Sequence, residues 1–72
     1  MVHNVERPEA EFYTFWQGYR TAIVVPYSED YTQWDTLILS CNAPKWKDLP
    51  MYFKISFIEY NGMNETLLHL KK

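Results

Sequence analysis

The 72-residue sequence has few of the residues that form disulfides, metal sites or phosphate-binding loops. It contains one cysteine, two histidines and two glycines. Cys41 alone cannot form an internal disulfide or supply a cysteine-based zinc site. His3 and His69 lie far apart and have no neighbours at metal-ligand spacing, and Gly18 and Gly62 are too few for a glycine-rich phosphate loop. We therefore expect no metal and no cofactor, and we interpret Cys41 as a small buried side chain.

Long hydrophobic runs are also missing. No apolar stretch approaches the roughly 20 residues that cross a bilayer. The segment from Met1 to Arg7 lacks the basic and apolar regions of a signal peptide. The expected setting is the cytoplasm, without membrane contact.

Aromatic residues are abundant instead. They make up 18% of the chain, and apolar types together make up 47%. This composition excludes intrinsic disorder, and the length suits one domain over residues 1–72. A domain this small needs its aromatic side chains for the core. Any surplus suits a partner surface or a second copy of the chain, so monomer and homodimer are both open.

Charge is spread unevenly along the chain, whose net charge is −2. Residues 1–35 hold six acidic residues and two arginines, a net of −4, whereas residues 36–72 hold five lysines and three acidic residues, a net of +2. Proteins that grip duplex nucleic acid by its phosphates are normally basic overall. The acidic first half argues against that class.

A short helix is predicted over residues 8–17. Pro8 suits a first helical turn, and Glu9 and Glu11 favour the positive end of the helix dipole. Gly18 supplies a left-handed cap at the other end. The aromatic residues between recur at helical spacing and predict one stripe facing the core: Phe12, Phe15, Trp16 and Tyr19.

Strands are predicted at residues 21–25, 36–40, 51–60 and 65–71, separated by a polar turn at 27–33, a loop at 42–50 and an Asn61-Gly62 hairpin turn. Alternation in the third strand places Met51, Phe53, Ile55 and Phe57 on one face, and Tyr52, Lys54, Ser56 and Tyr60 on the other. The order predicts a small α+β protein, with the N-terminal helix packed on an antiparallel or partly closed sheet. Closure into a barrel would need a further strand near His3 or within residues 27–33.

Two segments form a recognisable pattern. The first reads Phe12-x-x-Phe15-x-x-Gly18-x-Arg20-Thr21, and the second reads Trp34-Asp35-Thr36-Leu37-Ile38-Leu39. Together they resemble the ASCH domain, particularly its short phage and bacterial branch, with Trp34 in place of the glycine in that branch's Gly-Asp-x-Leu step. His3-Asn4-Val5 is similar to its opening His-x-Leu. The resemblance covers about residues 3–60 and implies a PUA-like β-barrel trimmed to near its minimum.

The same resemblance implies binding of RNA or of modified nucleosides. One branch of the family hydrolyses acetylated cytidine with a Lys, a Thr and a Glu. By position the Lys falls on Arg20 and the Thr on Thr21, while the family's Glu-x-Arg pair falls on Ile23 and Val25. Aliphatic side chains cannot transfer protons, so we expect no catalytic residues. Arg20 and Thr21 stay candidates for a nucleotide site, against the alternative that Arg20 lays its stem across an aromatic neighbour.

The favoured interpretation is a non-catalytic binding module of phage type that binds a host protein and inhibits or modulates it. The expected contacts are Trp46, Lys45, Lys47, Glu29 and Asp30. Trp46 stands between two lysines in the 42–50 loop, and tryptophan is enriched at binding hot spots. The alternative is that Trp46 folds back over the end of the barrel. Glu29 and Asp30 offer two acceptors to a basic partner, or form an ordinary turn with Ser28.

The alternative partner is RNA or a nucleoside. Tyr52 and Lys54 alternate on the open face of the 51–60 strand, where a ring can stack on a base and a lysine can meet a phosphate. Arg20 and Thr21 would complete such a site. The competing interpretation is an ordinary solvent-exposed sheet face, on which the tyrosines pack against side chains of neighbouring strands. A nucleoside amidohydrolase is the least favoured function.

Overall fold

The computed structural model describes residues 1–60, 62 and 64–72. These residues form β1 (Val2–Glu6), α1 (Glu9–Trp16), β2 (Ala22–Pro26), β3 (Thr36–Ser40), β4 (Met51–Tyr60) and β5 (Glu65–Lys71). The predicted helix and strands are confirmed to within one residue at each end. The predicted hairpin turn includes Asn61, which lies outside the described residues.

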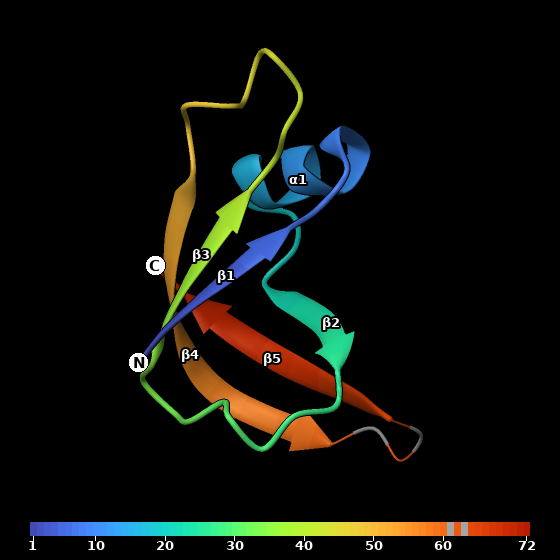
Figure 1. The fold of residues 1–72 in the computed structure, drawn as a ribbon, viewed down its shortest axis with the longest axis vertical. Helices are drawn as coiled ribbons and strands as arrows, with labels where there is room; N and C mark the ends of the chain where they lie inside the picture. The colour runs from blue at the N-terminus through green and yellow to red at the C-terminus, as the bar shows by residue number, and fades with distance from the viewer. Residues whose placement is uncertain (61, 63) are drawn as a thin grey trace.

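The strands form one mixed sheet in the order β1-β3-β4-β5-β2. β1 pairs with β3 in parallel, whereas the other neighbours pair antiparallel. The sheet curls into a half-barrel with β1 and β2 at its edges (Figure 1). The α+β class and the partly closed sheet are confirmed. The antiparallel alternative fails at one pairing, since β1 and β3 are parallel because the chain passes through α1 and β2 before returning beside β1 in the same direction.

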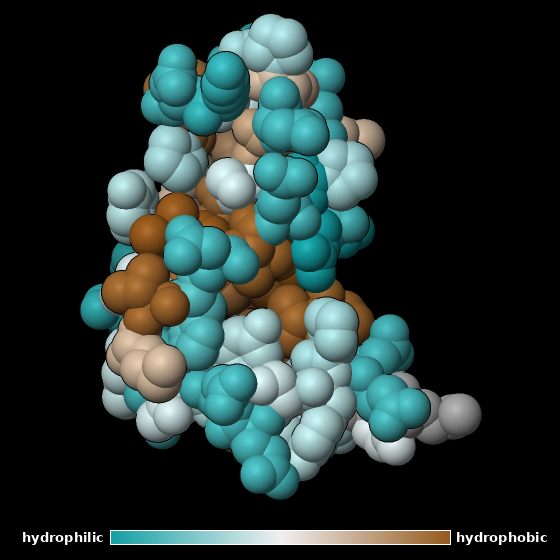
Figure 2. All heavy atoms as spheres, in the orientation of Figure 1, coloured by the Kyte–Doolittle hydropathy of each residue, from teal (hydrophilic) through white to brown (hydrophobic). Residues whose placement is uncertain are grey.

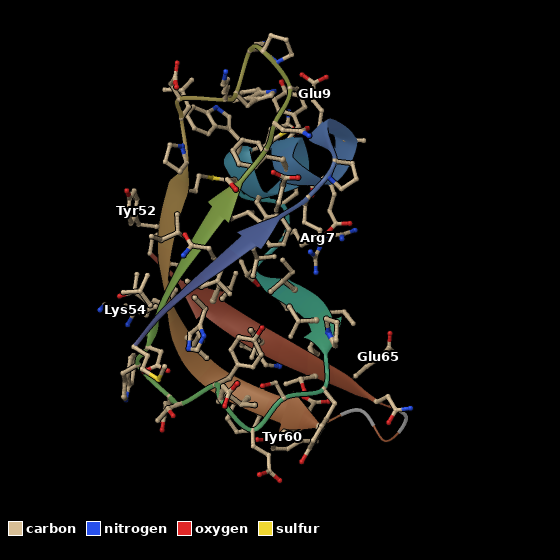
Figure 3. All side chains as sticks on the ribbon, in the orientation of Figure 1. Arg7, Glu9, Tyr52, Lys54, Tyr60 and Glu65 are labelled. Carbon is tan, nitrogen blue, oxygen red and sulfur yellow. The ribbon has the colours of Figure 1, made fainter. Side chains whose placement is uncertain are left out.

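β1 supplies the further strand near His3 that closure would require. It is weakly marked in the sequence because Val5 is its one buried side chain. The two edges are joined by Arg7, whose guanidinium donates to the carbonyl of Val24 at 2.7 Å and to that of Glu6 at 2.9 Å. Its Nε also lies 3.1 Å from a carboxylate oxygen of Glu11. Figure 3 shows Arg7 on this open side of the sheet.

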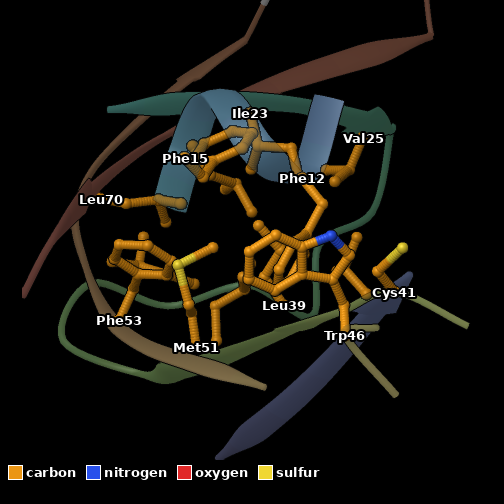
Figure 4. Packing of buried hydrophobic residues seen from close by; sticks show 14 residues of the cluster. Phe12, Phe15, Ile23, Val25, Leu39, Cys41, Trp46, Met51, Phe53 and Leu70 are labelled. Carbon is orange, nitrogen blue, oxygen red and sulfur yellow. The ribbon is translucent and has the colours of Figure 1, made fainter. Parts of the chain in front are cut away.

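The core fills the concave side of the sheet beneath α1. Figure 4 shows its packing, and Figure 2 shows hydrophobic atoms crossing the middle of the molecule. Its buried hydrophobic members are Val5, Phe12, Phe15, Ile23, Val25, Leu37, Leu39, Cys41, Trp46, Met51, Phe53, Ile55, Leu68 and Leu70. The burial predicted for Cys41 is confirmed. No helix among the described residues is long and apolar enough to cross a membrane.

The predicted core stripe of α1 is right for Phe12 and Phe15 and wrong for Trp16 and Tyr19. Trp16 is 43% exposed and Tyr19 is 81% exposed. α1 ends at Trp16, and Gly18 then adopts a φ of +83°, as predicted for a left-handed cap. Tyr19 therefore leaves the helical register before it can reach the core.

A β-bulge in β4 overturns part of the predicted alternation. Met51, Phe53 and Ile55 are buried as expected, but the register against β5 shifts between Ile55 and Phe57. The bulge turns Phe57 outward, where it is 56% exposed. It also places Tyr60 opposite the buried Thr66, so Tyr60 does not share the face of Tyr52.

Candidate functional site

The face of the sheet opposite α1 carries a pair of lysines on neighbouring strands. Lys54 of β4 lies directly opposite Lys71 of β5, and both are exposed. Like charges at opposing positions destabilise a sheet. Among the described residues no lysine forms an ion pair with a carboxylate, and Lys54 donates instead to the hydroxyl of Thr36 at 2.8 Å. The pair is therefore two cationic donors available to an anion.

Aromatic rings flank this lysine pair on the same face. Tyr52 is 63% exposed, and Figure 3 shows Tyr52 and Lys54 projecting from β4 away from α1. Phe57, brought outward by the bulge, lies opposite His69 with ring centroids 5.5 Å apart. We call these residues the outer face: Tyr52, Lys54, Phe57, His69 and Lys71. The outer face combines exposed rings with cationic side chains. The carboxylate of Glu59 lies 3.3 Å from Nε2 of His69.

The remaining nucleotide-site candidates lie at the end of β5. The carbonyl of Thr21 accepts the N–H of Leu70 at 2.7 Å, so Arg20 and Lys71 flank this hydrogen bond. The guanidinium of Arg20 stands 5.9 Å from the ring centroid of Phe15, which is the stacked arrangement offered as the alternative. The structure thus brings Tyr52 and Lys54 together and leaves Arg20 and Thr21 at the border of the outer face.

A strained turn leads into β3 beside the bulge. Trp34 has a φ of +74° and is 56% exposed. Its N–H donates to the carbonyl of Ile55 at 2.6 Å, and the side-chain amide of Gln33 donates to the carbonyl of Ser56 at 2.8 Å. Sequence reasoning did not name Trp34 as a site residue. The available signal was its position at the glycine of the family pattern, where a positive φ is ordinary.

Asp35 anchors this turn and is almost fully buried. Its carboxylate accepts hydrogen bonds from Nε2 of His3 at 2.8 Å, from the amino group of Met1 at 2.9 Å and from the N–H of Thr32 at 3.1 Å. These donors, His3 first, lower the pKa of Asp35 to about 2. The role is structural, because the contacts with Met1 and His3 tie the start of β1 to the start of β3, and the contact with Thr32 closes the turn that leads into β3.

Trp46 folds back over the end of the half-barrel, so the alternative interpretation of this residue is correct. It is 5% exposed and packs beside Phe12, with ring centroids 5.3 Å apart (Figure 4). Its ring centroid also lies 4.8 Å from that of Trp16. Its indole N–H donates to the carboxylate of Glu9 at 2.8 Å. Trp46 is not available as a direct contact for a partner, because a buried ring cannot also be a surface.

Exposed aromatics surround Trp46 instead. Tyr13 is 45% exposed and Trp16 is 43% exposed, and Lys45 and Lys47 lie exposed in the adjoining loop. The ammonium of Lys45 stands 5.1 Å from the ring centroid of Trp46. This cluster at the α1 end of the molecule differs from the outer face in position and in the elements that build it.

Glu29 and Asp30 lie at the opposite end of the molecule from the 42–50 loop (Figure 1). The N–H of Asp30 donates to the hydroxyl of Ser28 at 3.1 Å, which confirms turn chemistry there. The hydroxyl of Tyr27 donates to the carboxylate of Glu29 at 3.1 Å, and this contact raises the pKa of Tyr27. The structure therefore does not bring these two acidic residues together with Lys45 and Lys47.

The described part of the chain contains no detectable pocket and no group of three side chains able to hold a metal ion. Any ligand of the surfaces above would bind on an open face. Comparison with protein-family models and with curated protein sequences finds no match for this chain.

Proposed function

We propose that the protein is a binding module whose outer face takes single-stranded RNA. The observation that carries the proposal is the cross-strand pair of Lys54 and Lys71, which forms no ion pair with a carboxylate in the described part of the chain and is flanked by the exposed rings of Tyr52 and Phe57. Lysines supply contacts to phosphates, and aromatic rings stack on unpaired bases whatever their sequence. An open sheet face suits a strand of nucleotides better than it suits a small enclosed ligand.

The ASCH-type hypothesis supports the same function. The family pattern places a glycine where this chain has Trp34, and the left-handed backbone of Trp34 is the conformation that glycine adopts without strain. The half-barrel is also the shape expected of a trimmed PUA-like fold. The family position of the catalytic Lys is occupied by Arg20, held beside Phe15, so the proposal includes no catalytic step.

The test is the salt dependence of binding to a fluorescently labelled oligouridylate, followed by anisotropy. Two phosphate contacts predict a slope of log K against log salt of roughly −1.4, because each contact on a single strand contributes roughly −0.7. Lys54→Gln should reduce the slope to about half and weaken binding at low salt. The matched control is Lys47→Gln, which removes an exposed lysine at the other end of the molecule and should leave the slope unchanged.

Two results would contradict the proposal. One is the absence of binding at low salt by the unmodified protein. The other is an equal loss in Lys54→Gln and Lys47→Gln, which would show that any lysine serves and that no particular face is used.

A second candidate function is the binding of a host protein, as in a phage-type inhibitor or modulator. The exposed aromatic cluster of Tyr13 and Trp16 beside Lys45 and Lys47 favours it, because tryptophan and tyrosine dominate binding hot spots. Capture of one protein from a nuclease-treated bacterial lysate, lost in Trp16→Ala and kept in Lys54→Gln, would favour this candidate over RNA.

A further inference from the structure

Trp34 combines two costly features. Its φ of +74° lies in the left-handed region, which bulky side chains rarely adopt, and its indole is 56% exposed rather than packed in the core. Asn or Gly would take this backbone conformation with less strain. The fold therefore gains little from a tryptophan at this position.

The conformation of Trp34 is fixed by the residues around it. The N–H of Asp35 donates to the carbonyl of Thr32 at 3.0 Å, and the N–H of Thr32 donates to the carboxylate of Asp35 at 3.1 Å. The bonds to the carbonyls of Ile55 and Ser56 hold the other side of the turn against β4. Strain persists where the surroundings determine it in this way, and such places cluster at binding sites.

The turn also adjoins the outer face. The backbone of Trp34 is bonded to Ile55, the residue that follows Lys54 in β4 and precedes the bulge that turns Phe57 outward. Two residues beyond Trp34, the hydroxyl of Thr36 accepts a hydrogen bond from the ammonium group of Lys54. The backbone of Trp34 therefore adjoins the strand that carries the lysine on which the proposed function rests, and its indole is exposed.

We propose that Trp34 is a base-stacking residue that extends the outer face beyond β4. This inference rests on the proposed function and adds to it a residue that lies outside the strands. An indole offers a large π-surface to an unpaired base and needs no particular base. The hydrogen bonds of the turn hold the backbone of Trp34, and its indole is 56% exposed.

The test compares Trp34→Asn, Trp34→Phe and the control Tyr19→Ala in oligouridylate binding and in thermal unfolding. Trp34→Asn should bind about tenfold more weakly, equivalent to about 1.4 kcal/mol, because one stacked base is lost. Its unfolding midpoint should be unchanged or higher, since Asn accepts the left-handed backbone. Trp34→Phe keeps an aromatic ring and should retain most of the affinity. Tyr19→Ala removes an 81% exposed ring elsewhere and should bind normally.

Equal binding by Trp34→Asn and the unmodified protein would overturn the inference and leave the proposed function standing. A lower unfolding midpoint for Trp34→Asn would overturn it as well, because the indole would then serve the fold. If the unmodified protein fails to bind oligouridylate, the proposed function falls and this inference falls with it.

Discussion

At the scale of single residues, Asp35 connects the chain end, β1 and the turn before β3 through one carboxylate. It accepts from Met1, His3 and Thr32, at distances between 2.8 and 3.1 Å. A carboxylate with three donors is strongly favoured in its ionised form. The same group therefore fixes the parallel pairing of β1 with β3 and the strained backbone of Trp34.

This arrangement predicts how stability depends on pH. The folded-state pKa of Asp35, about 2, lies below the ordinary value of 3.8, so the ionised carboxylate stabilises the fold above about pH 4. That stability is lost as the pH falls from about 4 through 2. Asp35→Asn should lower the free energy of unfolding at neutral pH. That free energy should then fall less steeply between about pH 4 and about pH 2 than it does in the unmodified protein, as measured by denaturant unfolding across the pH range. If the free energy of unfolding of Asp35→Asn fell as steeply at low pH as that of the unmodified protein, this role of Asp35 would be contradicted.

Residue roles were only partly predictable from the sequence. The pattern around Trp34 and Asp35 marked both positions, but a positive φ at tryptophan depends on bonds to β4 that no local pattern encodes. Trp46 had two interpretations because a large ring serves equally well as a hot spot and as a core residue. Only the path of the 42–50 loop over α1 decides between them.

At the scale of elements, α1 is too short to be stable alone and depends on the loop that covers it. Trp46 packs against Phe12, Tyr13 and Trp16, and its N–H reaches Glu9 at the start of the helix. These contacts run along most of α1, whose bounds are Glu9 and Trp16. The loop and the helix thus form one packing unit.

Trp46→Ala should destabilise the protein by about 3–5 kcal/mol, the usual cost of removing a buried tryptophan. A chain of this length has a total stability of only about 4–11 kcal/mol. Denaturant unfolding should therefore show a large loss, with Trp46→Phe recovering part of it. A folded Trp46→Ala protein of near-normal stability would contradict the placement of this ring in the core.

The helix and strands could largely be predicted from the sequence, whereas the β-bulge in β4 could not. Alternation in β4 is regular in the sequence, so Phe57 and Tyr60 were assigned to the wrong faces. The extra residue is specified by pairing with β5 and by the hydroxyl of Ser56, which donates to the carbonyl of His69 at 3.0 Å. Long-range pairing of this kind leaves no local signal.

At the scale of the whole molecule, the half-barrel separates a packed concave side from an open convex side. The concave side is occupied by α1 and the core, and Arg7 bridges the two edge strands. The convex side is left bare, and it carries Lys54, Lys71 and the rings beside them. The sequence indicated an α+β protein and placed Tyr52 and Lys54 on the same face of one strand. It did not indicate Lys71 as the partner of Lys54, because that neighbour comes from the register of β4 with β5.

The most direct test of RNA binding at the outer face is a residue-resolved map of binding, obtained by titrating the isotope-labelled protein with oligouridylate and recording amide chemical shifts. We expect the largest shifts on Tyr52, Lys54, Phe57 and Lys71 and on the indole N–H of Trp34, and no shifts on α1 or the 42–50 loop. Shifts gathered on α1 and that loop, or no shifts at low salt, would contradict the assignment of the outer face as the RNA-binding surface.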